Sequence, residues 1–75
     1  MKVQTIGENA GIVWQLLNGD NRAWEFNEIK KATGLSSRDL NTAIGWLARE
    51  DKIQIEENDG TQDDRFYIAM NYYIG

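Results

Sequence analysis

The sequence of 75 residues contains no cysteine and no histidine, and these absences exclude several kinds of chemistry. Without cysteine, the chain has no disulfide and no thiolate ligand for a metal. Without histidine, it lacks the commonest general acid–base group and the usual nucleophile–base pairs. The remaining carboxylates are not spaced like a catalytic pair, and so short a chain has little room for a water-excluding pocket. We therefore predict that the protein is not an enzyme and holds no metal or other cofactor.

Long hydrophobic runs are absent as well. No apolar stretch approaches the roughly 20 residues that a helix needs to cross a bilayer. The N-terminal segment MKVQTIGENAG has no apolar signal core, so we expect a cytoplasmic protein with no membrane partner. A hydrophobic content of 41% with three tryptophans is enough for one small core. We expect residues 1–75 to form a single domain.

The first helix is predicted by a possible cap and an apolar stripe. Thr5 and Glu8 are three residues apart, as in a capping box. Turn-forming residues at 18–22 end the helix, and the segment AWEF at 23–26 alternates like a short strand. Trp14 widens the stripe on one side. The residues of the stripe are Ile6, Ala10, Val13 and Leu17.

Residues 27–50 have the pattern of two helices joined by a tight turn. Asn27 suits the N-cap of the second helix, and Gly34 suits the left-handed conformation that ends it. Ser36, with Asp39 three residues later, is typical of the start of a third helix, which runs to about residue 50. The residues predicted to face inward are Ile29, Ala32, Leu40, Ala43, Ile44 and Leu47.

The remaining residues predict a β-hairpin. Alternating apolar residues fix a register that also sets opposite charges across the two strands. This register centres the turn on Gly60-Thr61, with glycine where a type II′ turn requires it. The tail NYYIG, residues 71–75, is apolar enough to dock beside the first helix. The predicted pairs are Ile53 with Ile68, Ile55 with Phe66, and Glu56 with Arg65.

This order of elements resembles the winged helix-turn-helix superfamily. The residues EIKKATGLS at 28–36 look like the entry to its recognition helix, and Leu40, Ile44 and Leu47 match the apolar ladder of that helix. The detail is most similar to a small prokaryotic winged-helix family of unknown function. The resemblance implies an α+β fold: three helices, a short strand and a C-terminal two-stranded wing, with the strands forming a small antiparallel three-stranded sheet.

The chain departs from the superfamily in two places. Asp51 stands where bacterial members often have glycine, and aspartate tolerates the left-handed conformation better than most residues. The wing, residues 53–65, carries five acids against Arg65, so its charge of −4 equals the net charge of the whole chain. Wing tips of the superfamily often carry lysine or arginine instead. Because DNA affinity comes largely from cations at phosphates, an acidic wing opposes DNA binding.

The outward face of the third helix holds the candidate DNA-binding residues. Arginine and asparagine can read base edges in a major groove, although the same residues can equally form a solvated helix face. Gly45 costs the helix roughly 1 kcal/mol relative to alanine, so either a partner approaches closely there or a neighbouring helix packs on it. The resemblance adds two lysines of the second helix as backbone contacts. The candidates are Arg38, Asn41, Thr42, Gly45, Arg49, Lys30 and Lys31.

Trp46 borders this face, and two interpretations of it remain. Its ring can fold back onto the wing strands, which the sequence favours, or anchor a partner protein or a second copy.

Two functional hypotheses follow from these observations. The first is a DNA-binding protein, a transcriptional regulator with its third helix in the major groove, which needs a dimer mate or another subunit because it has few cations. The alternative is a protein-interaction or dimerisation module that does not bind DNA.

Overall fold

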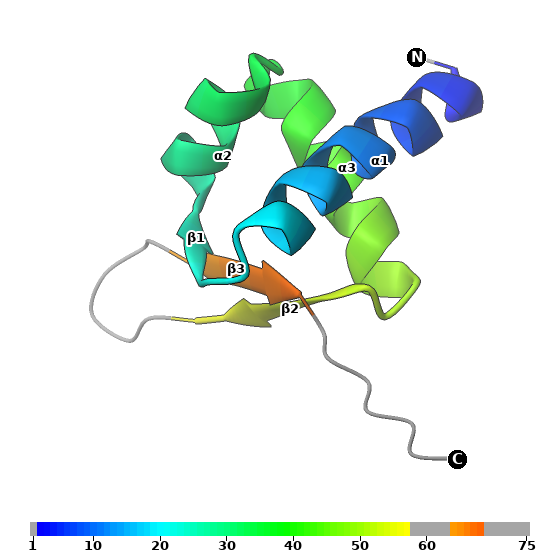
Figure 1. The fold of residues 1–75 in the computed structure, drawn as a ribbon. Helices are drawn as coiled ribbons and strands as arrows, with labels where there is room; N and C mark the ends of the chain where they lie inside the picture. Colours follow the sequence, from blue (N-terminus) through cyan, green and yellow to red (C-terminus); the bar gives the residue numbers. More distant parts are fainter. Residues whose placement is uncertain (1, 58–63, 69–75) are drawn as a thin grey trace.

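The computed structural model describes residues 2–57 and 64–68, and its element order confirms the predicted α+β fold. Figure 1 shows the three helices on one side of a three-stranded antiparallel sheet. Among the helices, α1 packs most extensively against α3. The elements are α1 (Val3–Gly19), β1 (Trp24–Glu25), α2 (Phe26–Thr33), α3 (Ser37–Arg49), β2 (Ile53–Glu56) and β3 (Arg65–Ile68).

The sheet has the order β1-β3-β2, so the last strand lies in the middle. The three predicted pairs of the hairpin are all present, and Trp24 of β1 extends the row formed by Ile55 and Phe66. Ile55 shares the apolar face but is 44% exposed, because β2 is an edge strand. The predicted turn at Gly60-Thr61 and the predicted docking of residues 71–75 lie outside the described residues.

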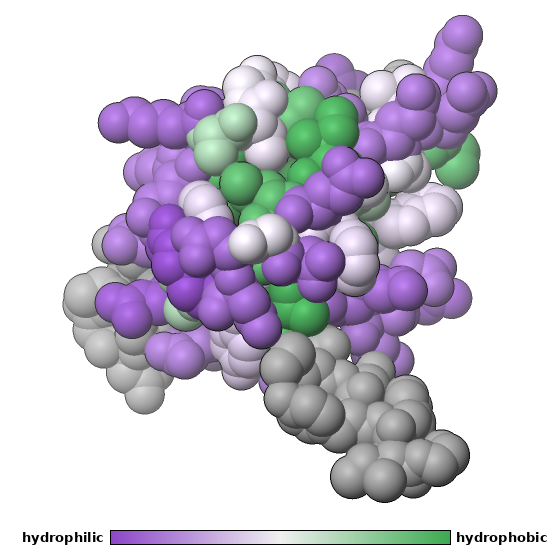
Figure 2. All heavy atoms as spheres, viewed as in Figure 1, coloured by the Kyte–Doolittle hydropathy of each residue, from purple (hydrophilic) through white to green (hydrophobic). Residues whose placement is uncertain are grey.

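The core lies between the helices and the sheet and contains nearly all of the residues predicted to face inward. Ala32 of α2 is outside the core, since it is exposed. The inward side of α2 is defined by Ile29 together with Phe26 and Thr33, and Ala32 lies on the other side of Ile29. Ile6 is only half-buried. Figure 2 shows hydrophobic residues in the middle of one face, bordered by hydrophilic ones.

Two helices begin earlier than predicted. α1 starts at Val3 with Lys2 as its N-cap, and no side chain caps it, so the capping box at Thr5 was wrong. α2 starts at Phe26 with Glu25 as its N-cap, in place of Asn27. The backbone N–H of Glu25 donates to the carboxylate of Glu28 at 2.9 Å and closes a capping box. This box lets the helix follow β1 directly, without a loop.

The turn between α2 and α3 has the predicted chemistry. Gly34 is left-handed, with φ of 74°, and its N–H donates to the carbonyl of Lys30 at 2.9 Å. The hydroxyl of Ser36 then accepts the N–H of Asp39 at 3.1 Å and caps α3. Thr33 adds a hydroxyl that accepts the N–H of Leu35 at 3.3 Å. These bonds fix the direction in which α3 leaves α2.

Asp51 takes the left-handed conformation, with φ of 56°, as predicted for this position. Its N–H donates to the carbonyl of Ala48 at 3.1 Å, and the N–H of Lys52 donates to that of Leu47 at 2.9 Å. Carbonyl groups at the end of α3 are thereby paired before the chain enters β2. The wing therefore leaves α3 through a hydrogen-bonded turn.

Candidate nucleic-acid interface

The buried side of α3 determines which residues it presents to the outside. Leu40 and Leu47 are buried in the core, and at 100° per residue the opposite side carries Arg38, Gly45 and Arg49. These three residues are exposed. Asn41 is exposed at the border of the same face, and Thr42 is half-buried within it. The structure thus brings the α3 candidates together, and we call Arg38, Asn41, Thr42, Gly45 and Arg49 the outward face.

The arginines of the outward face are not neutralised by carboxylates in the described part of the chain. The ion pairs within residues 2–57 and 64–68 join Arg22 to Asp20 and to Glu28. Neither Arg38 nor Arg49 takes part in one. A cation with no carboxylate partner can bind a phosphate or a base without first breaking an ion pair, so no described carboxylate competes with a ligand for either arginine.

Gly45 leaves the centre of the outward face flat. Apart from the adjoining residues and the backbone of α3 itself, no atom of the described residues lies within 4 Å of the position that a Cβ would take there. The possibility that a neighbouring helix packs on Gly45 is therefore excluded for this part of the chain. The other explanation, a close approach by a partner, is consistent with the open surface.

Thr42 has a more restricted role than its position suggests. Its hydroxyl donates to the carbonyl of Asp39 at 2.8 Å, so the O–H group is already used within the helix. The methyl group and the oxygen lone pairs remain for outside contacts. Thr42 can therefore contact an apolar group, such as a thymine methyl, or accept a hydrogen bond from a base.

Lys30 and Lys31 lie in the last turn of α2, apart from the outward face. They line a shallow hollow with Asn27, Gly34 and Leu35, and no residue of the outward face lines it. Lys31 is exposed, and Lys30 is half-buried. The candidate cations therefore form two groups, one on α2 and one on α3.

The described part of the wing is acidic at its outer end. Glu56 and Glu57 are exposed, and Arg65 of β3 lies across from Glu56 on one side and Glu25 on the other.

Within residues 2–57 and 64–68, no group of three or more acidic side chains is placed to hold a metal ion. Nor is any helix in this part of the chain long and apolar enough to cross a membrane.

Comparison with known proteins agrees with this architecture. The family model for the winged helix-turn-helix domain DUF2582 matches residues 1–66. The chain belongs to this family. Protein MJ1608 of Methanocaldococcus jannaschii, an uncharacterised archaeal protein, is 42% identical over 55 residues, which cover 72% of this chain and 79% of MJ1608. The match to a DUF2582 domain confirms the predicted winged-helix fold.

A solved structure gives the same picture of the DUF2582 fold. The solution NMR structure of protein BT2368 from Bacteroides thetaiotaomicron superposes with a TM-score of 0.78 at 35% sequence identity. The match covers 91% of this chain and 79% of BT2368. The fold is therefore shared with a bacterial protein as well as implied by an archaeal relative. Neither protein's name gives an activity.

Trp46 lies on the flank of α3 that faces α1. It is 40% exposed and lines a groove between α3 and α1, together with Gly7, Gly11 and Trp14. Leu47, Glu50 and Lys52 line the same groove, whereas no residue of β2 or β3 does. Trp46 therefore borders a groove that α3 shares with the first helix, and both interpretations of its ring stay predictions.

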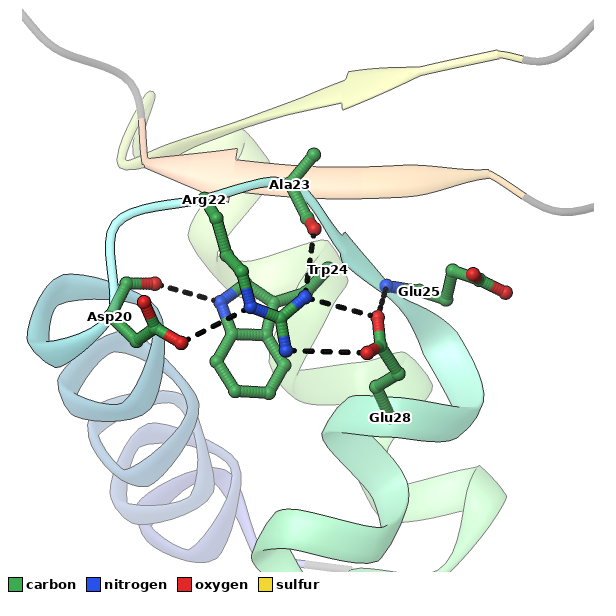
Figure 3. Close-up of polar contacts among 6 residues, drawn as sticks. All are labelled: Asp20, Arg22, Ala23, Trp24, Glu25 and Glu28. Atoms are coloured by element: carbon green, nitrogen blue, oxygen red, sulfur yellow. Dashed lines mark hydrogen bonds and ion pairs between the residues drawn. The ribbon is translucent and has the colours of Figure 1, made fainter.

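Sequence reasoning missed a polar cluster around Arg22, shown in Figure 3. The guanidinium of Arg22 lies 3.7 Å from the ring centroid of Trp24. It donates to the two carboxylate oxygens of Glu28 at 3.3 and 3.2 Å and to the carboxylate of Asp20 at 3.1 Å. The indole N–H of Trp24 donates to the carbonyl of Asp20 at 2.9 Å. The cluster therefore links the end of α1 to β1 and to the start of α2.

The cluster also changes the acidity of its members. The backbone N–H of Glu25 and then the guanidinium of Arg22 lower the pKa of the Glu28 carboxyl. The hydrogen bond to Glu28 raises the pKa of Arg22. The alternation of Asp20, Arg22 and Trp24 is the signal in the sequence that could have indicated the cluster. Since Arg22 is held by these contacts, we do not count it among the cations available to DNA.

Proposed function

We propose that this protein binds duplex DNA through the outward face of α3, placed in the major groove, and acts as a transcriptional regulator. The observation that carries the proposal is the arrangement of Arg38 and Arg49 on either side of Gly45. Both arginines are exposed and have no ion pair within the described residues, and no described atom covers the glycine between them. This surface presents two guanidinium groups, each able to donate paired hydrogen bonds, on either side of a glycine that a partner can approach closely.

The chemistry of the outward face suits base edges. Arginine can donate two hydrogen bonds to guanine, and asparagine can pair with adenine. Asn41 and the two arginines provide these groups, and the Thr42 methyl can contact thymine. Without a side chain at Gly45, the helix backbone can come closer to the floor of the groove than a larger residue would permit.

The charge balance limits the affinity that we expect. The net charge is −4, and the exposed acids Glu56 and Glu57 lie at the wing. Binding through Arg38, Arg49, Lys30 and Lys31 would release about four counterions, giving a slope of log K against log salt of roughly −4. One such domain would bind weakly at physiological salt, so we propose that it acts with a second copy or another subunit.

A second candidate function is a protein-interaction module without DNA binding. The observation in its favour is Trp46, which is 40% exposed on the flank of α3. Tryptophan is over-represented among residues that contribute most to protein interfaces. The acidic wing is equally compatible with this function, because it does not have to approach a phosphate backbone.

A titration of fluorescein-labelled, mixed-sequence duplex DNA, followed by anisotropy at low and moderate salt, tests the proposal. We expect salt-dependent binding that the double change Arg38→Ala/Arg49→Ala abolishes. A matched control, Lys2→Ala/Lys52→Ala, removes two positive charges away from the outward face and should retain most of the binding. Equal losses in both variants would show that the total charge matters and the outward face does not. No binding by the unmodified chain at low salt would contradict DNA recognition, and the occupancy of promoters in cells tests the regulatory role.

A further inference from the structure

The groove between α1 and α3 is an apolar surface that the described residues leave open. Its volume is about 350 Å³, which is near the lower limit of ligand pockets and fits a few side chains. Trp14 and Trp46 line it from the two helices, and Leu47 lines it from the core side of α3. Trp46 remains 40% exposed. A partner for this groove therefore needs apolar or aromatic side chains.

Two glycines keep the groove open on the side of α1. Gly7 and Gly11 are one helical turn apart and line the groove together. At both positions, no described atom outside the adjoining residues and the backbone of α1 lies within 4 Å of where a Cβ would be. Glycine in the interior of a helix weakens that helix relative to alanine. The space that they leave is free for side chains from outside α1.

The chain leaves the sheet at the edge of this groove. Ile68, the last residue of β3, pairs with Ile53, and Ile53 directly follows Lys52, which lines the groove. Ile68 therefore lies about one strand spacing, roughly 5 Å, from Ile53, the residue next to Lys52. Residues 69–75 can span roughly 23 Å when extended, whereas residues 7–14 of α1 rise about 10 Å. The segment is long enough to follow the groove.

The composition of residues 69–75 matches the groove. Their sequence, AMNYYIG, has no charged side chain and includes Tyr72, Tyr73 and Ile74. Tyrosine can place its ring on an apolar surface while its hydroxyl reaches a polar group at the rim. Glu50 and Lys52 line the groove and provide such groups. The DUF2582 match ends at residue 66, so this segment is additional to the part that the family model covers.

We propose that the C-terminal segment, residues 69–75, occupies the groove of its own chain, with its tyrosine rings against Trp14 and Trp46. The segment then covers the flank of α3 that faces α1. Arg38, Gly45 and Arg49 lie on a different side of α3 and stay exposed. The inference does not depend on DNA binding, because the groove and the segment do not involve the outward face.

NMR on the chain of residues 1–75 tests the proposal. We expect nuclear Overhauser contacts between the ring protons of Tyr72 or Tyr73 and the indole protons of Trp14 and Trp46. The double change Tyr72→Ser/Tyr73→Ser should shift the indole N–H signals of these two tryptophans, and the change Asn71→Ser should leave them in place. The indole N–H of Trp24 is an internal control, because it is bonded to the carbonyl of Asp20 at 2.9 Å.

A mixture of isotope-labelled and unlabelled chains identifies the occupant. Contacts within one chain, unchanged on dilution, support the proposal. Contacts between labelled and unlabelled chains would overturn it and assign the groove to the tail of a second copy. The absence of contacts, with unshifted indole signals in the tyrosine variant, would also overturn it and leave the groove to a separate partner protein.

Discussion

The guanidinium of Arg22 lies 3.7 Å from the ring centroid of Trp24, and its nitrogens reach both carboxylate oxygens of Glu28. Trp24 is buried in the core, whereas Arg22 is exposed. One side chain thus joins the loop after α1, the strand β1 and the first turn of α2. Since α3 follows α2 through a hydrogen-bonded turn, this contact helps to set the position of the outward face.

We predict that Arg22→Ala and Arg22→Lys both lower the thermal unfolding midpoint, with lysine intermediate. Lysine keeps a positive charge but loses the planar fork that binds Glu28 through two nitrogens and stacks on Trp24. Circular dichroism melts measure the change. Arg49→Ala is the control, since Arg49 is exposed and has no ion pair within residues 2–57 and 64–68. An equal loss in Arg49→Ala would contradict the role assigned to Arg22.

The lowered pKa of Glu28 predicts a dependence of stability on acidity. Above its ordinary pKa of 4.5 the carboxyl is charged in both states, and the folded state has the full benefit of Arg22 and the Glu25 N–H. As the pH falls below 4.5, the unfolded chain takes up a proton first, and the benefit is lost as the pH passes through the lowered value.

Glu28→Gln should therefore be less stable than the natural chain near neutral pH, and the difference should shrink as the pH falls below 4.5. Urea unfolding at several pH values measures this. Glu8→Gln is the matched control, because Glu8 is exposed and forms no ion pair within the described residues. A gap between Glu28→Gln and the natural chain that stays constant across this pH range argues against the linkage.

The sequence predicted the parts of the fold that depend on local chemistry or strict periodicity. Gly34 and Asp51 both take the left-handed conformation expected of them, and Ser36 caps α3. Leu40 and Leu47 are buried, as the helical spacing requires. In each case one backbone position or one repeating pattern allows few alternatives, so the residue type was sufficient.

The errors occurred where a distant contact decides the outcome. Asn27 is a better N-cap than glutamate by preference, yet α2 starts after Glu25 because Glu28 and Arg22 fix that turn. The groove beside Trp46 was not foreseen either, because its other side is α1, which is far away in sequence. The candidate residues on α3 were correctly placed on one face, but their lack of ion pairs within the described residues became visible only in three dimensions.

The cap of α3 is the subject of a third prediction. The Ser36 hydroxyl accepts the N–H of Asp39 at 3.1 Å, and Ser36→Ala removes this bond at an expected cost of about 1 kcal/mol in the free energy of unfolding. Urea unfolding measures the cost. Ser37→Ala, the first residue inside the helix, is the control and should change the stability little. If both variants lose the same amount, the cap does not determine the start of α3.

Gly45 provides a test that separates folding from recognition. Because no described atom beyond the adjoining residues and the helix backbone lies near the position of its Cβ, Gly45→Ala should stabilise the isolated protein by about 1 kcal/mol through helix propensity. Gly45→Leu should stabilise it by a similar but smaller amount. If DNA approaches this point, leucine should weaken binding at least tenfold, because about 1.4 kcal/mol of lost contact is enough for that change. Alanine should have a smaller effect on binding.

Urea unfolding and anisotropy titrations of the same two proteins measure both effects. Gly11→Ala serves as the control, because it adds a methyl group at another open glycine of a helix, on the side of α1 that lines the groove. It should leave DNA affinity unchanged. If Gly45→Leu binds DNA as tightly as the natural chain, the centre of the outward face is not in close contact with the duplex. The arginines would then have to act from the periphery of the interface.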